Sequence, residues 1–220
     1  MIEERPYQTE IIAKFHRTTA EFKRIIVVAP TGAGKTILAS KIIKDYIARQ
    51  QTVLVLAHRR EIIGQTSKKL RDLGVWHGII QAGTDPMLLA PVQVASVQTL
   101  WARAMRTDRM KLPEADLVVV DECHHATART WRAILDMYPE ATILGLTATP
   151  CRGDGRGLGG IFEIIIECPQ VAELIAHNPP YLVPSRVYAP SMPDLAGVKV
   201  QAGDYVGTQL ADRMDKAKLV

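Results

Sequence analysis

A lysine and a threonine end a glycine-containing segment, residues 29–36, which reads APTGAGKT. An apolar run, 24–29, comes before it, and a helical pattern, 35–50, comes after it. Glycines let such a turn direct backbone N–H groups and a helix N-terminus at an anion. The segment therefore predicts a phosphate-binding loop, although its first position is Ala29 and not the usual glycine. A chance glycine turn is the alternative that this strand–loop–helix context disfavours. The residues expected to hold nucleotide are Thr31, Gly32, Ala33, Gly34, Lys35 and Thr36.

The second group of chemically capable residues is an acidic pair, Asp121 and Glu122, at the end of the apolar run LVVVDE. Ligands of open α/β sheets collect at the carboxyl ends of the strands. With the phosphate loop, the pair predicts an ATP site in which Lys35 neutralises the β- and γ-phosphates, and Thr36 and Asp121 hold Mg²⁺. Glu122 would polarise the attacking water. Alone, the pair would be an ordinary polar strand end.

Short β-branched runs alternate with longer helical patterns along the chain. Near-continuous apolar strands alternating with helices predict an α/β fold, in which a parallel β-sheet is flanked by helices on both faces. The expected strands are 24–29, 52–57, 78–82, 92–96, 116–121, 141–147 and 161–166. The expected helices are 35–50, 59–73, 97–106, 128–137, 170–176 and 207–217.

The composition is that of an ordinary globular protein, with 220 residues, 47% hydrophobic content and a formal net charge of +4. The basic balance allows a polyanionic partner without demanding one. Three cysteines without a C-x-x-C pair argue against a disulfide framework and favour a cytoplasmic location. No apolar run is long enough for a membrane span, and we expect no membrane partner.

The character of the sequence changes after Pro150, where 151–160 is half glycine and a proline-rich stretch follows at 178–193. Dense prolines are typical of a domain edge. We therefore predict an ATP-binding domain over 1–177 and, over 178–220, a linker that leads into a second domain.

Several further segments match one family in order. Asp121-Glu122-Cys123-His124 resembles motif II of the DExH branch of the superfamily 2 helicases, and residues 29–36 resemble motif I. The other matches are Arg5–Gln8 (the glutamine motif), 56–61 (motif Ia), 96–100 (motif Ib) and 147–150 (motif III). The set covers residues 5–150, and its motif sequences most resemble those of the restriction-subunit and excision-repair-like helicases. The resemblance implies a RecA-like P-loop NTPase fold and an ATP- and Mg²⁺-dependent helicase or translocase.

The resemblance also implies roles for individual residues. Gln8 would hydrogen-bond the adenine edge, and His124 would couple the ATP site to Thr147 or Thr149. The residues implied to line the nucleic-acid track are Arg59, Arg60, Gln98 and Thr99, with Arg103, Arg106 and Arg109 as further candidates. Low aromatic content, 5%, points to backbone recognition without sequence specificity. As a separate expectation, the nucleic-acid partner is DNA in preference to RNA.

The family's motifs IV to VI belong to a second RecA-like lobe, and they do not occur in this sequence. We therefore expect a first lobe that binds nucleotide weakly and turns it over slowly until the second lobe completes it. Two alternatives remain. One is a nucleotide-controlled module that binds nucleic acid or protein without productive unwinding, and the other is a small-molecule kinase, for which we find no acceptor pocket.

Three smaller expectations complete the picture. Adjacent Cys123, His124 and His125 are a poor zinc site, since neighbouring side chains rarely converge on one metal. The basic positions of 68–71 are expected to face solvent. The three tryptophans, Trp76, Trp101 and Trp131, are expected to be packing residues.

Overall fold

Seven short apolar strands pair side by side in one parallel sheet, in the order β3-β4-β2-β5-β6-β1-β7. The structure is a computed structural model that describes residues 4–150, 157–184, 195–201, 204–205 and 207–216. The strands are β1 (Arg24–Val28), β2 (Val53–Ala57), β3 (His77–Ile80), β4 (Val92–Ser96), β5 (Leu117–Asp121), β6 (Thr142–Thr147) and β7 (Ile164–Glu167). The predicted parallel α/β fold is confirmed.

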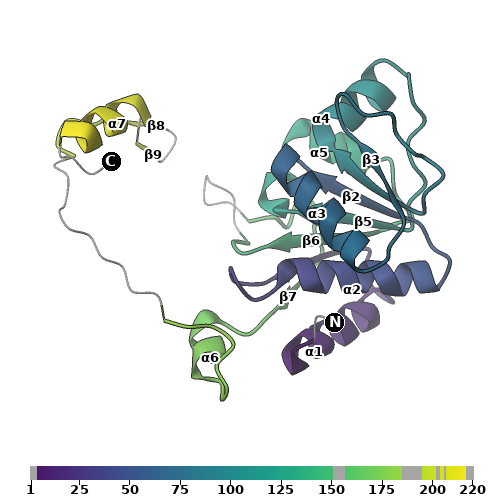
Figure 1. Ribbon diagram of the computed structural model, residues 1–220, viewed down its shortest axis with the longest axis horizontal. Helices are drawn as coiled ribbons and strands as arrows, with labels where there is room; N and C mark the ends of the chain where they lie inside the picture. The colour runs from purple at the N-terminus through teal and green to yellow at the C-terminus, as the bar shows by residue number, and fades with distance from the viewer. Residues whose placement is uncertain (1–3, 151–156, 185–194, 202–203, 206, 217–220) are drawn as a thin grey trace.

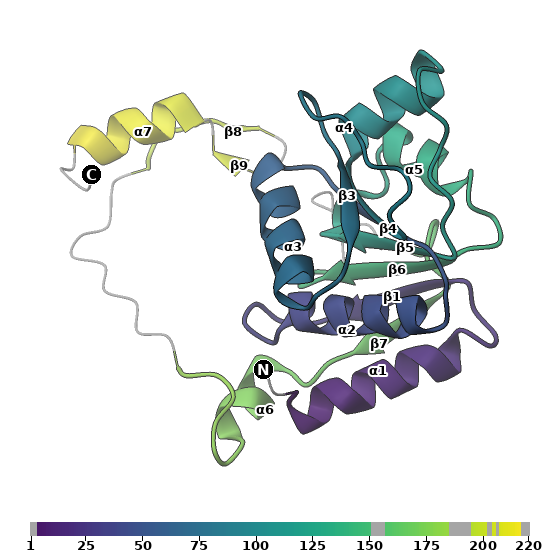
Figure 2. The ribbon, with the colours of Figure 1, turned by 45° about the vertical axis from the view of Figure 1, so that its right-hand side comes forward.

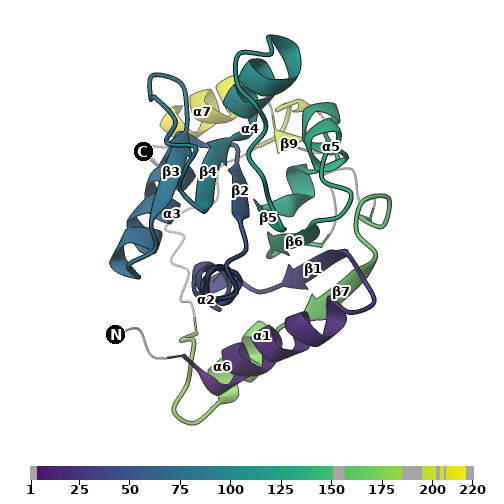
Figure 3. The same ribbon diagram turned by 90° about the vertical axis from the view of Figure 1, so that its right-hand side faces the viewer.

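Helices cover both faces of this sheet, as Figure 3 shows: α1, α2 and α3 lie on one side, and α4 and α5 on the other. Figure 2 shows α1 running beside β7 at one margin of the sheet. The helical elements are α1 (Pro6–Thr18), α2 (Lys35–Ala48), α3 (Arg60–Asp72), α4 (Val97–Leu100), the π-helix η1 (Trp101–Arg106), the 3₁₀ turn η2 (Cys123–His125), α5 (Arg129–Leu135) and α6 (Val171–Ala176).

The strands are apolar on both faces because each face packs on helices. Successive residues of a strand point to opposite faces, so Ile25 and Val27 of β1 join the cluster under α1, α2 and α3. Ile26 and Val28 join the cluster under α4 and α5. This two-sided burial explains the near-continuous apolar runs in the sequence.

The strand order brings the key loops together. β5, β6 and β1 are consecutive neighbours in the sheet and run parallel, so the segments that follow their carboxyl ends meet at one edge. These segments carry the phosphate loop, the acidic pair and the TATP sequence. The β2 and β4 ends, with Ala57 paired to Ser96, lie further along the same edge.

Helix α1 is missing from the sequence-based prediction, although its signal was present. Pro6 stands at the first helical position, and Tyr7, Ile11 and Phe15 repeat at helical spacing and are buried. The predicted helix 97–106 is α-helical only through Leu100 and continues as a π-helix. The other elements agree with prediction to within a few residues at their ends.

The packing role expected for the tryptophans holds for only part of the set. Trp131 is buried at 4% exposure and Trp101 packs partly buried on the same cluster. Trp76 is 58% exposed, so the prediction was wrong there. Trp76 directly precedes β3, which forms one margin of the sheet.

The segment after β7 returns to the domain. Tyr181 and Leu182 pack against the cluster that contains residues of α1, so the beginning of the predicted linker contacts the predicted ATP-binding domain. Further along, β8 (Val200–Gln201) and β9 (Asp204–Tyr205) form an antiparallel pair that the sequence did not suggest, and α7 (Gly207–Lys216) follows (Figure 1). The predicted boundary at residue 177 stays a prediction, and the glycine-rich residues 151–156 lie outside the described residues. Among the described residues, no helix is both long and apolar enough to cross a bilayer.

Candidate nucleotide-binding site

Two glycines with positive φ form the turn between β1 and α2. Gly32 has φ +84° and Gly34 has φ +85°, a region that residues with a Cβ rarely adopt. Gly34 is also the residue before α2, and a Cβ there would collide with the side-chain amide nitrogen of Gln8. The loop is thus built for glycine at both positions, with the α2 N-terminus free of any side-chain cap.

Two side chains of α1 donate hydrogen bonds to the backbone of this loop. The Tyr7 hydroxyl donates to the Ala33 carbonyl at 2.7 Å, and the Gln8 amide donates to the same oxygen at 3.1 Å. The Gln8 carbonyl oxygen accepts from the Arg5 backbone N–H at 3.0 Å, and the side chain is 1% exposed. Gln8 therefore supports the phosphate loop directly. Its expected contact with adenine stays a prediction.

The metal-binding candidates from the two halves of the sequence line one small pocket. Thr36, in the first turn of α2, and Asp121, at the end of β5, share a pocket of about 50 Å³ with Ser40, Gln65 and Thr66. A hydroxyl and a carboxylate are hard oxygen donors of the kind that Mg²⁺ takes alongside phosphate oxygens and water. The Lys35 ammonium is close by and donates to the Ala29 carbonyl at 3.4 Å.

Burial and neighbouring charges act on the Asp121 carboxyl, and they do not all act in the same direction. Burial raises the pKa of its carboxyl, the neighbouring Glu122 charge raises it further, and the Lys35 ammonium opposes both. The Glu122 backbone N–H donates to the Asp121 carboxylate at 3.0 Å. Glu122 itself sits at φ +51°, an uncommon conformation for a residue with a side chain, at the turn into η2. The Lys35 ammonium favours the ionised form of the Asp121 carboxyl, and the ionised form is the one that can bind a cation such as Mg²⁺.

The predicted coupling residues lie together. His124 Nδ1 is 3.4 Å from the Glu122 carboxylate and 3.3 Å from the Thr147 hydroxyl. Thr147 is completely buried, and its hydroxyl also bonds the Thr149 backbone. The Thr147 carbonyl accepts from the Ala29 N–H at 2.9 Å. A continuous set of contacts thus runs from the acidic pair to the start of the phosphate loop.

Sequence reasoning did not single out His58, which directly follows β2. Burial lowers the pKa of its imidazole, Arg59 and His124 lower it further, and the Asp121 and Glu122 carboxylates act against them. His58 is therefore close enough to the acidic pair to interact with it electrostatically. Its position after a strand end was the signal that could have identified it.

The expected nucleic-acid residues occupy two adjacent strand ends. Arg59 and Arg60 begin α3 and are exposed. Gln98 and Thr99 lie in α4. The Ser96 hydroxyl caps the start of this helix by accepting a hydrogen bond from the Thr99 N–H at 3.4 Å. Since β2 and β4 are hydrogen-bonded neighbours, the two pairs lie along one edge of the sheet.

A second set of residues that sequence reasoning missed comes from the segment after α6. The Tyr181 ring lies 5.4 Å from the Tyr7 ring, stacks on His177 at 4.0 Å and carries the Arg5 guanidinium at 5.0 Å. Leu182 reaches Gly32 so closely that a Cβ on that glycine would stand 2.9 Å from the Leu182 side chain. Nothing in the local sequence signals these contacts, because they arise only when the chain folds back on α1.

Residues 1–152 match the family described as "Type III restriction enzyme, res subunit". The putative ATP-dependent helicase IRC3 of Saccharomyces cerevisiae is 30% identical over 215 residues, covering 90% of this chain and 30% of that protein. The DNA 3'-5' translocase XPB2 of Sulfurisphaera tokodaii is 33% identical over 156 residues, covering 70% and 33%.

Among solved structures, the Hef helicase domain of Pyrococcus furiosus superposes with a TM-score of 0.62 at 25% identity, covering 76% of this chain and 38% of that one. The chain spans about a third of the length of curated relatives that it matches, between 30% and 38% for the first three.

Proposed function

Because this chain belongs to the family of the type III restriction enzyme res subunit, within the superfamily 2 helicases, we propose that it is the ATP-binding lobe of a nucleic-acid helicase or translocase. Helicases related to this chain are named as ATP-dependent. We propose further that it hydrolyses ATP with Mg²⁺ when a second lobe completes the site.

The observation that carries this proposal is the pocket shared by Thr36 and Asp121. Thr36 lies in the first turn of α2 and Asp121 at the end of β5, far apart in the sequence, yet both line one small pocket. Lys35 acts electrostatically on the same carboxylate. Mg²⁺, when bound, would supply positive charge to the β- and γ-phosphates.

Each residue of the proposed ATP site then has its own role. The N–H groups of the glycine turn hold the phosphates, and Lys35 leaves the Ala29 carbonyl to neutralise them. The Glu122 carboxylate orients the attacking water and accepts its proton. His124, which contacts both Glu122 and Thr147, links the state of the water-orienting carboxylate to β6.

A second lobe is proposed because phosphoryl transfer in related motors needs an arginine from outside the phosphate loop. Such an arginine contributes roughly 10³ to 10⁵ in rate. The matched segment makes up between 30% and 38% of these three relatives, which leaves room for such a lobe in them.

The proposed partner is the backbone of a nucleic acid, with DNA favoured over RNA. The exposed Arg59 and Arg60 stand at the sheet edge beside Gln98 and Thr99, where phosphate contact is available. XPB2 is named as a DNA translocase, while the mouse relative DHX58 is named as an RNA helicase.

Nucleotide binding by the chain tests the ATP site. A fluorescent ATP analogue is titrated with Mg²⁺ and again with a chelator in place of Mg²⁺, using wild type, Lys35→Ala and Lys44→Ala. Lys44 is exposed on the same helix and is the matched control. We expect chelation and Lys35→Ala each to weaken binding at least about tenfold, with Lys44→Ala unchanged. Equal affinities for all three proteins would show that the site assignment is wrong.

Turnover is tested in the full-length parent protein, where ATPase rates are compared with single-stranded DNA, duplex DNA and RNA. Stimulation by a polynucleotide that Lys35→Ala abolishes supports a motor. Nucleotide-dependent binding of nucleic acid without turnover would support the binding-module alternative.

A further inference from the structure

A groove of about 630 Å³ lies between η1, the loop that follows it and the loop that precedes β4. Alanine, leucine and methionine side chains form the apolar part of its lining, and basic side chains form much of the rest. The lining residues are Asp85, Pro86, Leu88, Ala102, Arg103, Arg106, Thr107, Arg109, Met110 and Lys111.

The groove is strongly cationic. Arg103, Arg106, Arg109 and Lys111 face a single lining carboxylate, that of Asp85. Within the part of the chain that the structure describes, none of these four cations takes part in an ion pair. Arg106, Arg109 and Lys111 are exposed. All four basic side chains line this one concave surface.

Arg103 differs from the other three because it builds the wall of the groove. Its guanidinium donates to the Thr84 carbonyl at 3.2 Å and to the Gln81 carbonyl at 3.3 Å, which ties η1 to the loop before β4. The π-helical turn is closed by the Thr107 N–H and hydroxyl, both donating to the Ala102 carbonyl. π-Helical turns inside helices are uncommon and occur frequently at functional sites.

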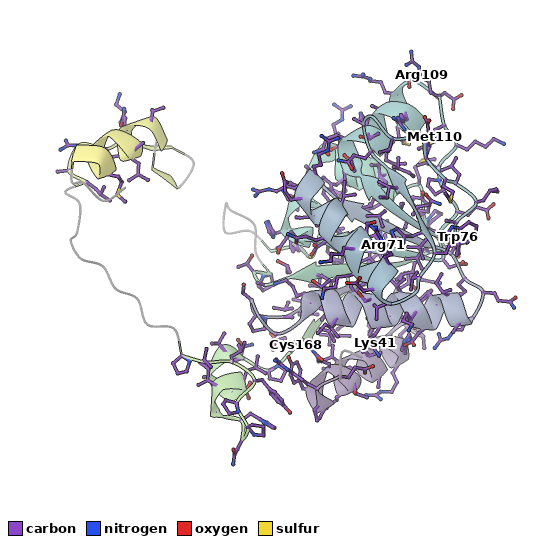
Figure 4. All side chains as sticks on the ribbon, viewed as in Figure 1. Lys41, Arg71, Trp76, Arg109, Met110 and Cys168 are labelled. Carbon is purple, nitrogen blue, oxygen red and sulfur yellow. The ribbon has the colours of Figure 1, made fainter. Side chains whose placement is uncertain are left out.

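The groove is separate from the expected track of motifs Ia and Ib but stands on the same helix. Gln98 and Thr99 occupy the start of α4, and Arg106 ends η1. A helical run of this length spans about 12–15 Å. Figure 4 shows Arg109 and Met110 together at the outer end of the domain, with Cys168 labelled at the opposite end. One extended strand or duplex could therefore contact both places.

We infer that this groove is a second binding site for the phosphate backbone of the nucleic acid, outlying the track formed by Arg59, Arg60, Gln98 and Thr99. The inference rests on the proposed function. Arginine forks match phosphate oxygens, and neutralising phosphates releases counterions, which favours binding at low salt. No aromatic side chain lines the groove, so the contacts proposed there are to the phosphate backbone and do not include base stacking.

The test measures the salt dependence of nucleic-acid binding by the chain. A fluorescein-labelled duplex DNA of about 30 base pairs, three helical turns, and an RNA strand of the same sequence are titrated between about 50 and 200 mM salt. The variant is Arg106→Glu with Arg109→Glu. Its matched control is Lys14→Glu with Arg17→Glu, an equal charge change on exposed residues of α1, which lies at the other end of the domain (Figure 1).

We expect the Arg106/Arg109 variant to bind duplex DNA about tenfold more weakly and its log–log salt slope to be shallower by about 2, since each lost phosphate contact removes about 0.9. The control should keep both the affinity and the slope of wild type. Lysine at both positions should restore the slope, because a phosphate contact needs the charge and not the guanidinium. Both arginines are exposed, and a milder pair, Arg106→Gln with Arg109→Gln, should show the same change in slope.

Each other outcome has a distinct meaning. If wild type binds neither DNA nor RNA, the proposed function fails. If wild type binds and the Arg106/Arg109 and Lys14/Arg17 glutamate variants lose the same affinity and slope, the loss is an effect of net charge and the groove is not a binding site. A loss with RNA only would assign the groove to RNA and overturn the expected preference for DNA.

Discussion

Replacing Gly34 by alanine should damage the phosphate loop more than an otherwise similar glycine replacement. Two separate penalties apply. An L-residue at φ +85° costs about 1–2 kcal/mol relative to glycine. The new Cβ also collides with the Gln8 amide, which must then give up its bond to the Ala33 carbonyl and its bond from the Arg5 N–H. Two such bonds contribute about 2 kcal/mol together.

Gly74 provides the matched control because its φ is +71° and no atom lies within 4 Å of a Cβ added there. Gly74→Ala should therefore carry only the backbone penalty. A difference of about 2 kcal/mol corresponds to a further fall of about 4–8 °C in the melting temperature of a chain of this size. The phosphate loop is also displaced only in Gly34→Ala, so nucleotide affinity should fall about tenfold or more in that variant alone.

The assay is thermal unfolding of both variants combined with titration of a fluorescent ATP analogue. A double variant, Gly34→Ala with Gln8→Ala, removes the colliding group, and its destabilisation should be smaller than the sum of the single effects. If Gly34→Ala and Gly74→Ala lower the melting temperature equally and leave nucleotide affinity alike, the contact between Gln8 and the loop is not what the structure indicates, and the reasoning is refuted.

Two further changes test the site and the sheet beneath it. Asp121→Asn should raise the melting temperature of the nucleotide-free chain at neutral pH, because burial and Glu122 raise the Asp121 pKa and the ionised carboxylate is unfavourable when folded. The gain should shrink as the pH falls through that raised pKa and be absent below the ordinary value of 3.8, where the carboxyl is protonated in both the folded and the unfolded chain. Nucleotide affinity with Mg²⁺ should be lower in the variant, and a gain in melting temperature that persists in acid would contradict this reasoning. Gly145→Ala should destabilise the chain by about 1–3 kcal/mol, since its Cβ would meet Phe162 at 2.7 Å and Cys123 at 2.9 Å in the core. Gly64→Ala, in α3 with open space around it, should instead stabilise by about 0.5–1 kcal/mol, and thermal melts showing the same sign for both would count against this packing.

Much of the fold could be predicted from the sequence because its signals are local. The apolar runs of β1 and β5 could only be buried on both sides, which requires a parallel sheet with helices on each face. The glycine turn between a strand and a helix could only be a tight loop. Helix α1 was also predictable, because Pro6 stands at its first position and its buried residues repeat at helical spacing. The π-helical end of the 97–106 helix, in contrast, has no evident sequence signal.

The site divides in the same way. Lys35 and Thr36 follow the glycines directly, and Glu122 follows Asp121, so each pair could be assigned from the chain itself. That Thr36 and Asp121 would line one pocket depended on the order of strands, because β5, β6 and β1 must be neighbours for their ends to meet. The family resemblance anticipated that meeting, but local chemistry did not.

The sequence by itself determined which residues can hold phosphate and metal, because backbone conformation at glycine and donor chemistry at lysine, threonine and aspartate are properties of short segments. Only the tertiary structure decided what supports them. The bonds from Tyr7 and Gln8 to Ala33, and the approach of Tyr181 and Leu182 to the loop, join segments remote in the sequence. The cationic groove beside η1 likewise needs the loop before β4 to be pinned by Arg103. Such contacts follow from the packing of the whole chain, in which many distant groups must fit at once, and no local pattern specifies them.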